Sequence, residues 1–179
     1  TPFEEVSQGE IAVNDKITSY YLETENKKDT LLSLLQSLPI TSAIVFVNHR
    51  STAVELSDLL LRNHILSSAF SGYFDERKRI AIMSDFRKGD IRVLVATDAA
   101  ARGIDIRELS HVIHYDIPID TETFIHRSGR TAHQGNEGIS ISLLSAEEMK
   151  SEVGIYIRMH SQAYTPQDTH PVDLSIPYQ

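Results

Sequence analysis

Short apolar runs alternate along this chain with segments whose apolar residues recur at helical spacing. Six runs predict strands, and most of the segments between them predict helices. Continuously apolar runs such as 42–47 and 91–96 are typical of strands buried on both faces of a sheet. The predicted strands are 17–22, 42–47, 66–70, 91–96, 111–115 and 138–144, and the predicted helices are 27–38, 51–63, 75–89, 121–129 and 146–160.

This alternation predicts an α/β fold. Strands separated by helix-length segments form right-handed βαβ crossovers, which give a parallel sheet with helices on both faces. Ser51 is a plausible N-cap for the second helix, and Gly89 closes the third. Ligands of such sheets bind beyond the carboxyl ends of the strands. We therefore expect the functional loops to follow the strands at 42–47, 66–70, 91–96 and 111–115.

The composition fits one globular domain. The chain has 179 residues, of which 41% are hydrophobic and 23% charged. No apolar run approaches the ~20 residues that span a bilayer. The polar, acidic start, TPFEEVSQGE, excludes a signal peptide, and the missing initiator Met indicates a piece of a longer chain. Zero cysteines exclude disulfides and thiolate metal sites and favour an intracellular location.

The net charge of −8 argues against binding a polyanion, but the cations are unevenly placed. Residues 77–130 carry 10 Lys and Arg against 8 Asp and Glu, whereas the flanking segments are both acidic. The cations therefore concentrate in the middle of the chain. A solvated face of mixed charge explains this distribution as well as a binding surface does.

Two stretches after strands combine cations with a helix start. In FVNHRS (46–51), Asn48 and Arg50 precede a helix, and its N-terminal N–H groups suit a phosphate, although plain capping is an equal alternative. In FSGYFDERKR (70–79), Gly72 permits close backbone approach. The cations that begin the next helix, Arg79 among them, oppose its dipole, a conflict that favours a functional role.

Two further stretches carry small residues or clustered arginines. In VATDAAARGID (95–105), a buried strand gives way to a small-residue loop, which suits a backbone lying against a polymer or a phosphate; a short helical turn with an Asp cap is the alternative. In HRSGRTAHQGNEG (126–138), two arginines flank a glycine that costs a helix up to ~1 kcal/mol. Arginine suits bidentate phosphate recognition, so this segment favours a polyanion clamp.

Several nucleotide and metal motifs are absent from the sequence. There is no G-x-x-x-x-G-K-[ST] and no G-x-G-x-x-G, and the eight histidines show no H-E-x-x-H spacing, so we expect no metal site. The residues thus predict arginine clamps for phosphate without a loop that holds ATP.

The four stretches together resemble the C-terminal RecA-like domain of DEAD-box ATP-dependent RNA helicases. IVFVNHR, SGYFDERKR, VATDAAARGIDI and VIHYDIPIDTETFIHRSGRTA stand in the order and spacing of that family. The resemblance covers roughly residues 16–150. It implies a RecA-like fold that lacks its own phosphate-binding loop, and a partner domain that supplies that loop and closes with this one around ATP and single-stranded RNA.

The resemblance also implies roles for individual residues. Arg130 would be an arginine finger on the γ-phosphate, His133 stands where the family has a second finger, and Asp105 would contact the ribose of ATP. His126 would link to the other domain, and Arg127 would be a structural or interdomain arginine. The residues expected to contact RNA are Asn48, Arg50, Gly72, Arg79, Thr97, Asp98 and Gly103.

The sequence departs from the family pattern at three places. Glu76 replaces a usual glutamine, and Ser71-Gly72-Tyr73 replaces His-Gly-Asp. An added carboxylate should weaken RNA binding. Most seriously, His133 replaces an arginine, and with an ordinary pKa of ~6.5 it is mostly neutral at pH 7. Either hydrolysis is slow and rests on Arg130, or the γ-phosphate itself holds His133 charged.

Two functions remain open. The first is the C-terminal half of an ATP-dependent RNA helicase that unwinds short duplexes or remodels RNA–protein complexes. The second is a helicase-derived RNA clamp or scaffold whose ATPase activity is weak or lost. ATP and Mg²⁺ would be held mainly by the N-terminal domain, so we expect the isolated chain to be inactive.

The expected organisation is an N-terminal linker (1–15), the RecA-like domain (16–160) and an extended tail or linker (161–179). The expected partners are single-stranded RNA, short RNA duplexes and the N-terminal RecA-like domain, in a monomer without membrane association. FIHRSGRTA is similar to helicases of small-ribosomal-subunit assembly, which implies ribosome biogenesis. The expected compartment is the nucleus, nucleolus or cytoplasm.

Overall fold

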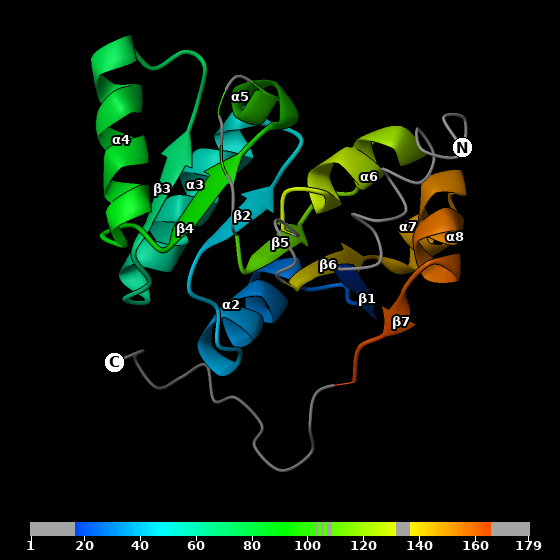
Figure 1. Ribbon diagram of the computed structural model, residues 1–179. Coiled ribbons are helices and arrows are strands. Elements are labelled where there is room, and N and C mark those ends of the chain that lie inside the picture. Colours follow the sequence, from blue (N-terminus) through cyan, green and yellow to red (C-terminus); the bar gives the residue numbers. More distant parts are fainter. Residues whose placement is uncertain (1–16, 103, 105, 107–108, 132–136, 166–179) are drawn as a thin grey trace.

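The computed structural model describes residues 17–102, 104, 106, 109–131 and 137–165. These residues form one sheet of parallel strands with helices on both faces, as Figure 1 shows, which confirms the predicted α/β class. The strands are β1 (Ile17–Glu23), β2 (Ala43–Phe46), β3 (Ser67–Phe70), β4 (Val93–Ala96), β5 (His111–His114), β6 (Gly138–Leu144) and β7 (Gln162–Ala163). The helices are α2 (Lys27–Ser37), α3 (Arg50–Arg62), α4 (Glu76–Lys88), α5 (Asp98–Arg102), α6 (Thr121–Ser128), α7 (Ala146–Met149) and α8 (Glu152–Met159).

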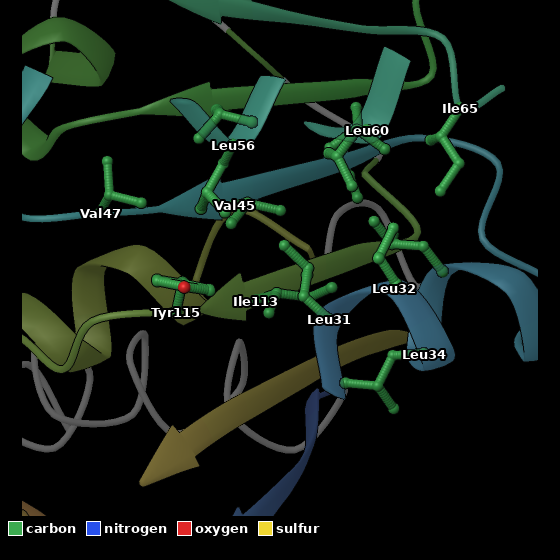
Figure 2. Close-up of a cluster of buried hydrophobic side chains, with 14 of the residues drawn as sticks. Leu31, Leu32, Leu34, Val45, Val47, Leu56, Leu60, Ile65, Ile113 and Tyr115 are labelled. Carbon is green, nitrogen blue, oxygen red and sulfur yellow. The ribbon is translucent and has the colours of Figure 1, made fainter. Parts of the chain in front are cut away.

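The sheet has the strand order β3-β4-β2-β5-β6-β1-β7, so β5 is its central strand, with β2 and β6 on either side. All four residues of β2, β4 and β5 are buried, which explains why β2 and β4 read as continuous apolar runs. Successive residues point to opposite faces of a strand. Val45 accordingly packs with α2 and α3, while Ile44 and Phe46 pack with α4 and α5. Figure 2 shows the first of these two cores, where Leu31, Leu56 and Leu60 meet the sheet.

Three details differ from the expectations. The segment predicted as one helix at 146–160 is two helices, because Ser145 forms a capping box with Glu148 and Ser151 caps a second helix start. Helix α3 begins at Arg50, so Ser51 lies in its first turn and is not its N-cap. Within the predicted tail, β7 pairs with β1.

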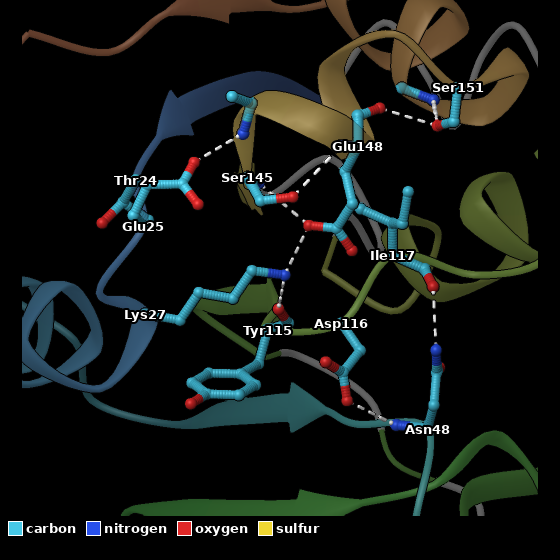
Figure 3. Close-up of polar contacts among 12 residues, drawn as sticks. Thr24, Glu25, Lys27, Asn48, Tyr115, Asp116, Ile117, Ser145, Glu148 and Ser151 are labelled. Carbon is cyan, nitrogen blue, oxygen red and sulfur yellow. Dashed lines mark hydrogen bonds and ion pairs between the residues drawn. The ribbon is translucent and has the colours of Figure 1, made fainter.

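A polar cluster ties the two ends of the domain together, as Figure 3 shows. The Lys27 ammonium, at the start of α2, donates to the Tyr115 carbonyl at 2.9 Å and lies 2.7 Å from the Glu148 carboxylate. Glu148 also accepts from the backbone N–H of Ser145. One carboxylate thus caps α7 and anchors α2. No helix in the described part of the chain combines the length and apolar character needed to cross a membrane.

Candidate nucleic-acid and phosphate site

The carboxyl ends of four neighbouring strands lie level in the sheet. Phe46, the last residue of β2, is paired with Ala96 at the end of β4 and with His114 at the end of β5, and Phe70 of β3 is also paired with Ala96. The loops that leave these strands therefore start at one edge. The sequence predicted the functional residues in these loops, and the register brings the loops together.

Arg127 is a buried charged side chain at this edge. It lies in α6, is 2% exposed, and its Nε and Nη2 each donate to a different carboxylate oxygen of Asp98 at 2.7 Å. Its Nη1 donates to the Asp116 carbonyl at 2.8 Å, and its guanidinium lies 4.9 Å from the centre of the Phe46 ring. A bidentate pair with these added contacts fixes α6 against the ends of β2, β4 and β5. Of the expected roles, this geometry is that of a structural arginine.

Asn48 belongs to the same network. Its side-chain oxygen accepts from Arg127 at 3.3 Å and its amide donates to the Ile117 carbonyl at 3.2 Å, while its backbone N–H donates to the Asp116 carboxylate at 2.8 Å. Figure 3 shows the contacts with Asp116 and Ile117. We expected the side chains of Asn48 and Asp98 to contact RNA. In the structure both form hydrogen bonds with other residues of the protein. Asp116 was missed in the sequence, although its place directly after a buried strand was a signal.

Arg50 lies on the outer side of this edge. It begins α3, is exposed, and its guanidinium carbon lies 3.7 Å from the ring centre of Tyr73 in the loop after β3. The N-cap residue His49 makes no side-chain hydrogen bond to the first turn of α3. Gly72 is exposed next to Tyr73, and a Cβ added there would meet nothing within 4 Å. Arg50, Gly72 and Tyr73 therefore form one exposed corner.

Arg79 lines a shallow groove beside this corner. It lies in the first turns of α4, and the groove, about 250 Å³ in volume, is also lined by Glu76, Ile80, Met83 and Ile104. The Nε of Arg79 is buried without a hydrogen-bond partner in the described structure. Asp75 caps the helix by accepting from the Lys78 N–H at 2.8 Å, and it offsets part of the cost of cations at a helix start. Glu76 places a carboxylate in the same groove.

Arg130 and His126 line a second cavity, of about 230 Å³, together with Phe46, Asp98 and Arg127. The Nη1 of Arg130 donates to the Ile104 carbonyl at 3.3 Å. Because Ile104 also lines the groove of Arg79, the two arginines reach the segment after α5 from two sides. Helix α6 ends at Ser128, so Gly129 and Arg130 follow it in a turn.

Thr97 and Asp98 begin the short helix α5. The Thr97 hydroxyl accepts from the Ala100 N–H at 3.3 Å, so the threonine caps this helix while the Asp98 side chain turns to Arg127. This loop thus contains the short helical turn that the sequence analysis gave as an alternative, but its cap is Thr97 and not Asp98. Both residues are partly exposed, so a ligand at this edge can reach them. The candidates Gly103, Asp105 and His133 lie outside the described residues.

Strand β5 carries a buried histidine at each end, and one of them, His114, underlies the site. Burial, with the charge of Arg127 as the second cause, holds the pKa of His114 well below its ordinary value. Its Nε2 is 2.8 Å from the Ser140 hydroxyl, and its ring lies between Phe46 and Phe124. Burial and then the charge of Arg92 lower the pKa of His111 to about 4. Both histidines are therefore neutral at neutral pH, but only His114 supports this edge, because His111 lies at the amino end of β5, paired with Ala43.

The donors at this edge suit anions. Guanidinium groups and backbone N–H donors suit phosphate oxygens. No group of three or more metal-ligating side chains is assembled among the residues described. The cavity that Arg130 shares with His126 therefore suits an anion.

Comparison with known proteins agrees with this geometry. Residues 26–135 match the helicase conserved C-terminal domain family. The chain is 37% identical over 148 residues to the ATP-dependent RNA helicase DeaD of Mycobacterium tuberculosis, and 40% identical over 146 residues to the ATP-dependent RNA helicase FAL1 of Kluyveromyces lactis. These matches cover 83% and 80% of the chain but only 26% and 36% of the relatives, so the chain spans about a third of their length or less.

A solved structure extends the agreement to three dimensions. The DEAD-box protein SrmB of E. coli, in a crystal structure with the regulator of ribonuclease activity A, aligns with a TM-score of 0.73 at 38% identity. The alignment covers 83% of this chain and 89% of that one. The likeness therefore includes nearly the whole of the compared chain and most of the described sheet.

Proposed function

Because this chain belongs to the DEAD-box RNA helicases and contains their C-terminal RecA-like domain, we propose that it forms one half of an ATP-dependent RNA helicase. In the full-length protein it would close against an N-terminal RecA-like domain, with RNA and ATP between them, and would unwind short duplexes or remodel RNA–protein complexes. One observation carries this proposal: Arg50, Arg79 and Arg130, far apart in sequence, all reach the same edge of the sheet.

The RNA contacts would lie at the outer corner and groove. Arg50 and Arg79 supply guanidinium groups, and Gly72 supplies a backbone that a phosphate can approach closely. Thr97 and Gly103 would contact the same strand. Asn48 and Asp98 would act there through their bonds to Arg127, by fixing the loops that carry the other contacts. Contacts of this kind position a strand without reading its sequence.

The ATP contacts would lie at the second cavity. Arg130 would stabilise charge on the γ-phosphate when the domains close, with His133 beside it and Asp105 at the ribose. His126 is exposed at the mouth of this cavity and would face the other domain. ATP and Mg²⁺ would be held mainly by that domain, so we expect this chain to be inactive alone. Bound Mg²⁺ supplies charge neutralisation for phosphoryl transfer.

A second function is favoured by Glu76. Its carboxylate lines the same groove as Arg79, where an RNA phosphate would be repelled. With histidine at position 133, this favours a helicase-derived clamp or scaffold whose hydrolysis is weak or lost.

For the cellular role we propose a monomeric, intracellular protein of the nucleus, nucleolus or cytoplasm that acts in ribosome biogenesis.

Single-turnover ATP hydrolysis with RNA, measured on the full-length protein, separates the two functions. Arginine fingers contribute about 10³–10⁵ in rate in related phosphoryl transfers, so Arg130→Ala should slow an active enzyme by orders of magnitude. Arg62→Ala, at the exposed end of α3, is the matched control and should leave the rate unchanged. A wild-type rate no higher than that of Arg130→Ala would reject the enzyme, and a faster His133→Arg variant would show that the missing cation limits the rate.

A further inference from the structure

Tyr73 is one of the most exposed aromatic or aliphatic side chains in the described structure. It is 78% exposed, yet the guanidinium of Arg50 lies 3.7 Å from its ring centre, which is stacking distance. In the sheet, β4 lies between the strands that precede these residues, so the pair spans the end of β4. An exposed cation–π contact stabilises the fold by only about 0.5–1 kcal/mol. Because this contribution to stability is small, the stack is also available to bind a ligand.

Hydrogen bonds fix the turn that carries Tyr73. Phe74 N–H donates to the Ser71 carbonyl at 3.1 Å, which closes a turn with Gly72 and Tyr73 at its corner. The Ser71 hydroxyl accepts from the Tyr73 N–H at 3.1 Å. Phe74 packs against both hydrophobic cores, and the Lys78 ammonium lies 3.9 Å from its ring centre. The tyrosine is therefore presented outward on a fixed turn.

The stack is built from two surfaces that nucleobases recognise. Bases stack on aromatic rings and on guanidinium planes, and they do so with little sequence preference. Stacking occupies the face of a guanidinium and leaves its N–H donors in the plane, where they can bind a phosphate. Arg50 can therefore hold the RNA backbone while the Arg50–Tyr73 stack meets a neighbouring base.

We propose that Arg50 and Tyr73 form a stacking platform for one base of the bound RNA strand. This inference rests on the proposed RNA-binding function and deepens it, because the other contacts at this edge involve phosphates. Tyr73 stands where the family pattern has an aspartate, so the platform is a property of this sequence. It offsets part of the RNA affinity that the carboxylate of Glu76 removes.

The test compares two RNAs on the same chain at low salt. One is a single-stranded RNA with all its bases, labelled with 2-aminopurine, and the other is an abasic RNA of equal length. Tyr73→Ala should weaken binding of the first by about five- to hundredfold and leave binding of the second unchanged. Tyr73→Phe keeps the ring and should retain both the affinity and the 2-aminopurine quenching.

Each other outcome has one meaning. Equal weakening on both RNAs would show that Tyr73 only positions Arg50, and wild-type affinity of Tyr73→Ala would show that no base meets the ring. Either result would reject the platform but not the proposed RNA-binding function. If the wild-type chain binds neither RNA, the proposed RNA-binding function fails with it. Urea unfolding of the variants controls for misfolding, and the exposure of Tyr73 predicts little change.

Discussion

At the scale of single residues, the site depends on the charge of Arg127, which supports the fold and need not contact a ligand. Arg127→Ala would leave a cavity and remove the hydrogen bonds to Asp98, whose carboxylate is partly exposed. It should lower the free energy of unfolding by about 2–4 kcal/mol. Arg127→Lys should also destabilise the fold, because an ammonium cannot make the bidentate contact with Asp98. Urea unfolding measures both, and Arg62→Ala is the exposed control, expected within about 1 kcal/mol of wild type.

A substitution at Gly72 can test ligand contact separately from fold stability, because the backbone conformation there does not require glycine. A Cβ there meets nothing within 4 Å, so Gly72→Ala should leave the unfolding free energy equal or raise it slightly. If an RNA phosphate approaches this backbone, the same methyl should weaken RNA binding by about two- to tenfold, the loss of one hydrogen bond. Gly89→Ala is the opposite control: its φ of 87° strains the variant, which should lose about 1 kcal/mol of stability and keep its RNA affinity. Unchanged RNA binding in Gly72→Ala would remove Gly72 from the interface.

The buried histidines make stability fall on acidification. Below their ordinary pKa of about 6.5 the unfolded chain binds protons that the folded chain excludes, since His111 has its pKa lowered to about 4. The unfolding free energy should thus drop between pH 6.5 and 4, by up to about 1.4 kcal/mol per pH unit for each histidine. His111→Leu should flatten this slope, and Arg62→Ala, at an exposed position, should not. Equal slopes in wild type and His111→Leu would contradict the assignment.

At the scale of elements, hydrophobic period predicted the sheet well because its strands are buried on both faces. The runs at 42–47 and 91–96 became β2 and β4 within one or two residues at each end. The period could not show the break between α7 and α8, because the apolar spacing continues across it and only the serine caps interrupt the helix. Nor could it show β7, whose two residues depend on pairing with β1.

Gly154 lies where α7 and α8 approach each other closely at that break. It lies in the first turn of α8, where alanine ordinarily adds up to about 1 kcal/mol to helix stability. Here an added Cβ would overlap the Glu148 carbonyl of α7, so the backbones of the two helices approach more closely than a side chain allows. Gly154→Ala should therefore destabilise the fold by about 1–3 kcal/mol, as overpacking does. Chemical denaturation decides the sign, and a stabilised variant would show that α7 and α8 can move apart.

At the scale of the whole molecule, the sequence located the edge but not its internal bonds. Parallel topology places four loops together, and their cations were visible as local conflicts with helix stability. The pairing of Asp98 with Arg127 was not visible, because the two residues are 29 positions apart and Asp98 was expected to contact RNA. One signal existed: Arg127 lies on the face of α6 that also buries Phe124 and Ser128, and a charge on a buried face needs a partner.

The overall charge makes the location of RNA contacts testable. A net charge of −8 repels RNA, so binding must come from a few local cations and should be strongly salt-dependent. Each phosphate neutralised on a single strand contributes about −0.7 to the slope of log affinity against log salt concentration. Arg50→Gln and Arg79→Gln should each reduce the steepness of that slope by about this amount. Lys88→Gln, at the far end of α4 from Arg79, should not. A slope that responds equally to all three would mean that RNA meets the domain as a diffuse charge, with no preferred edge.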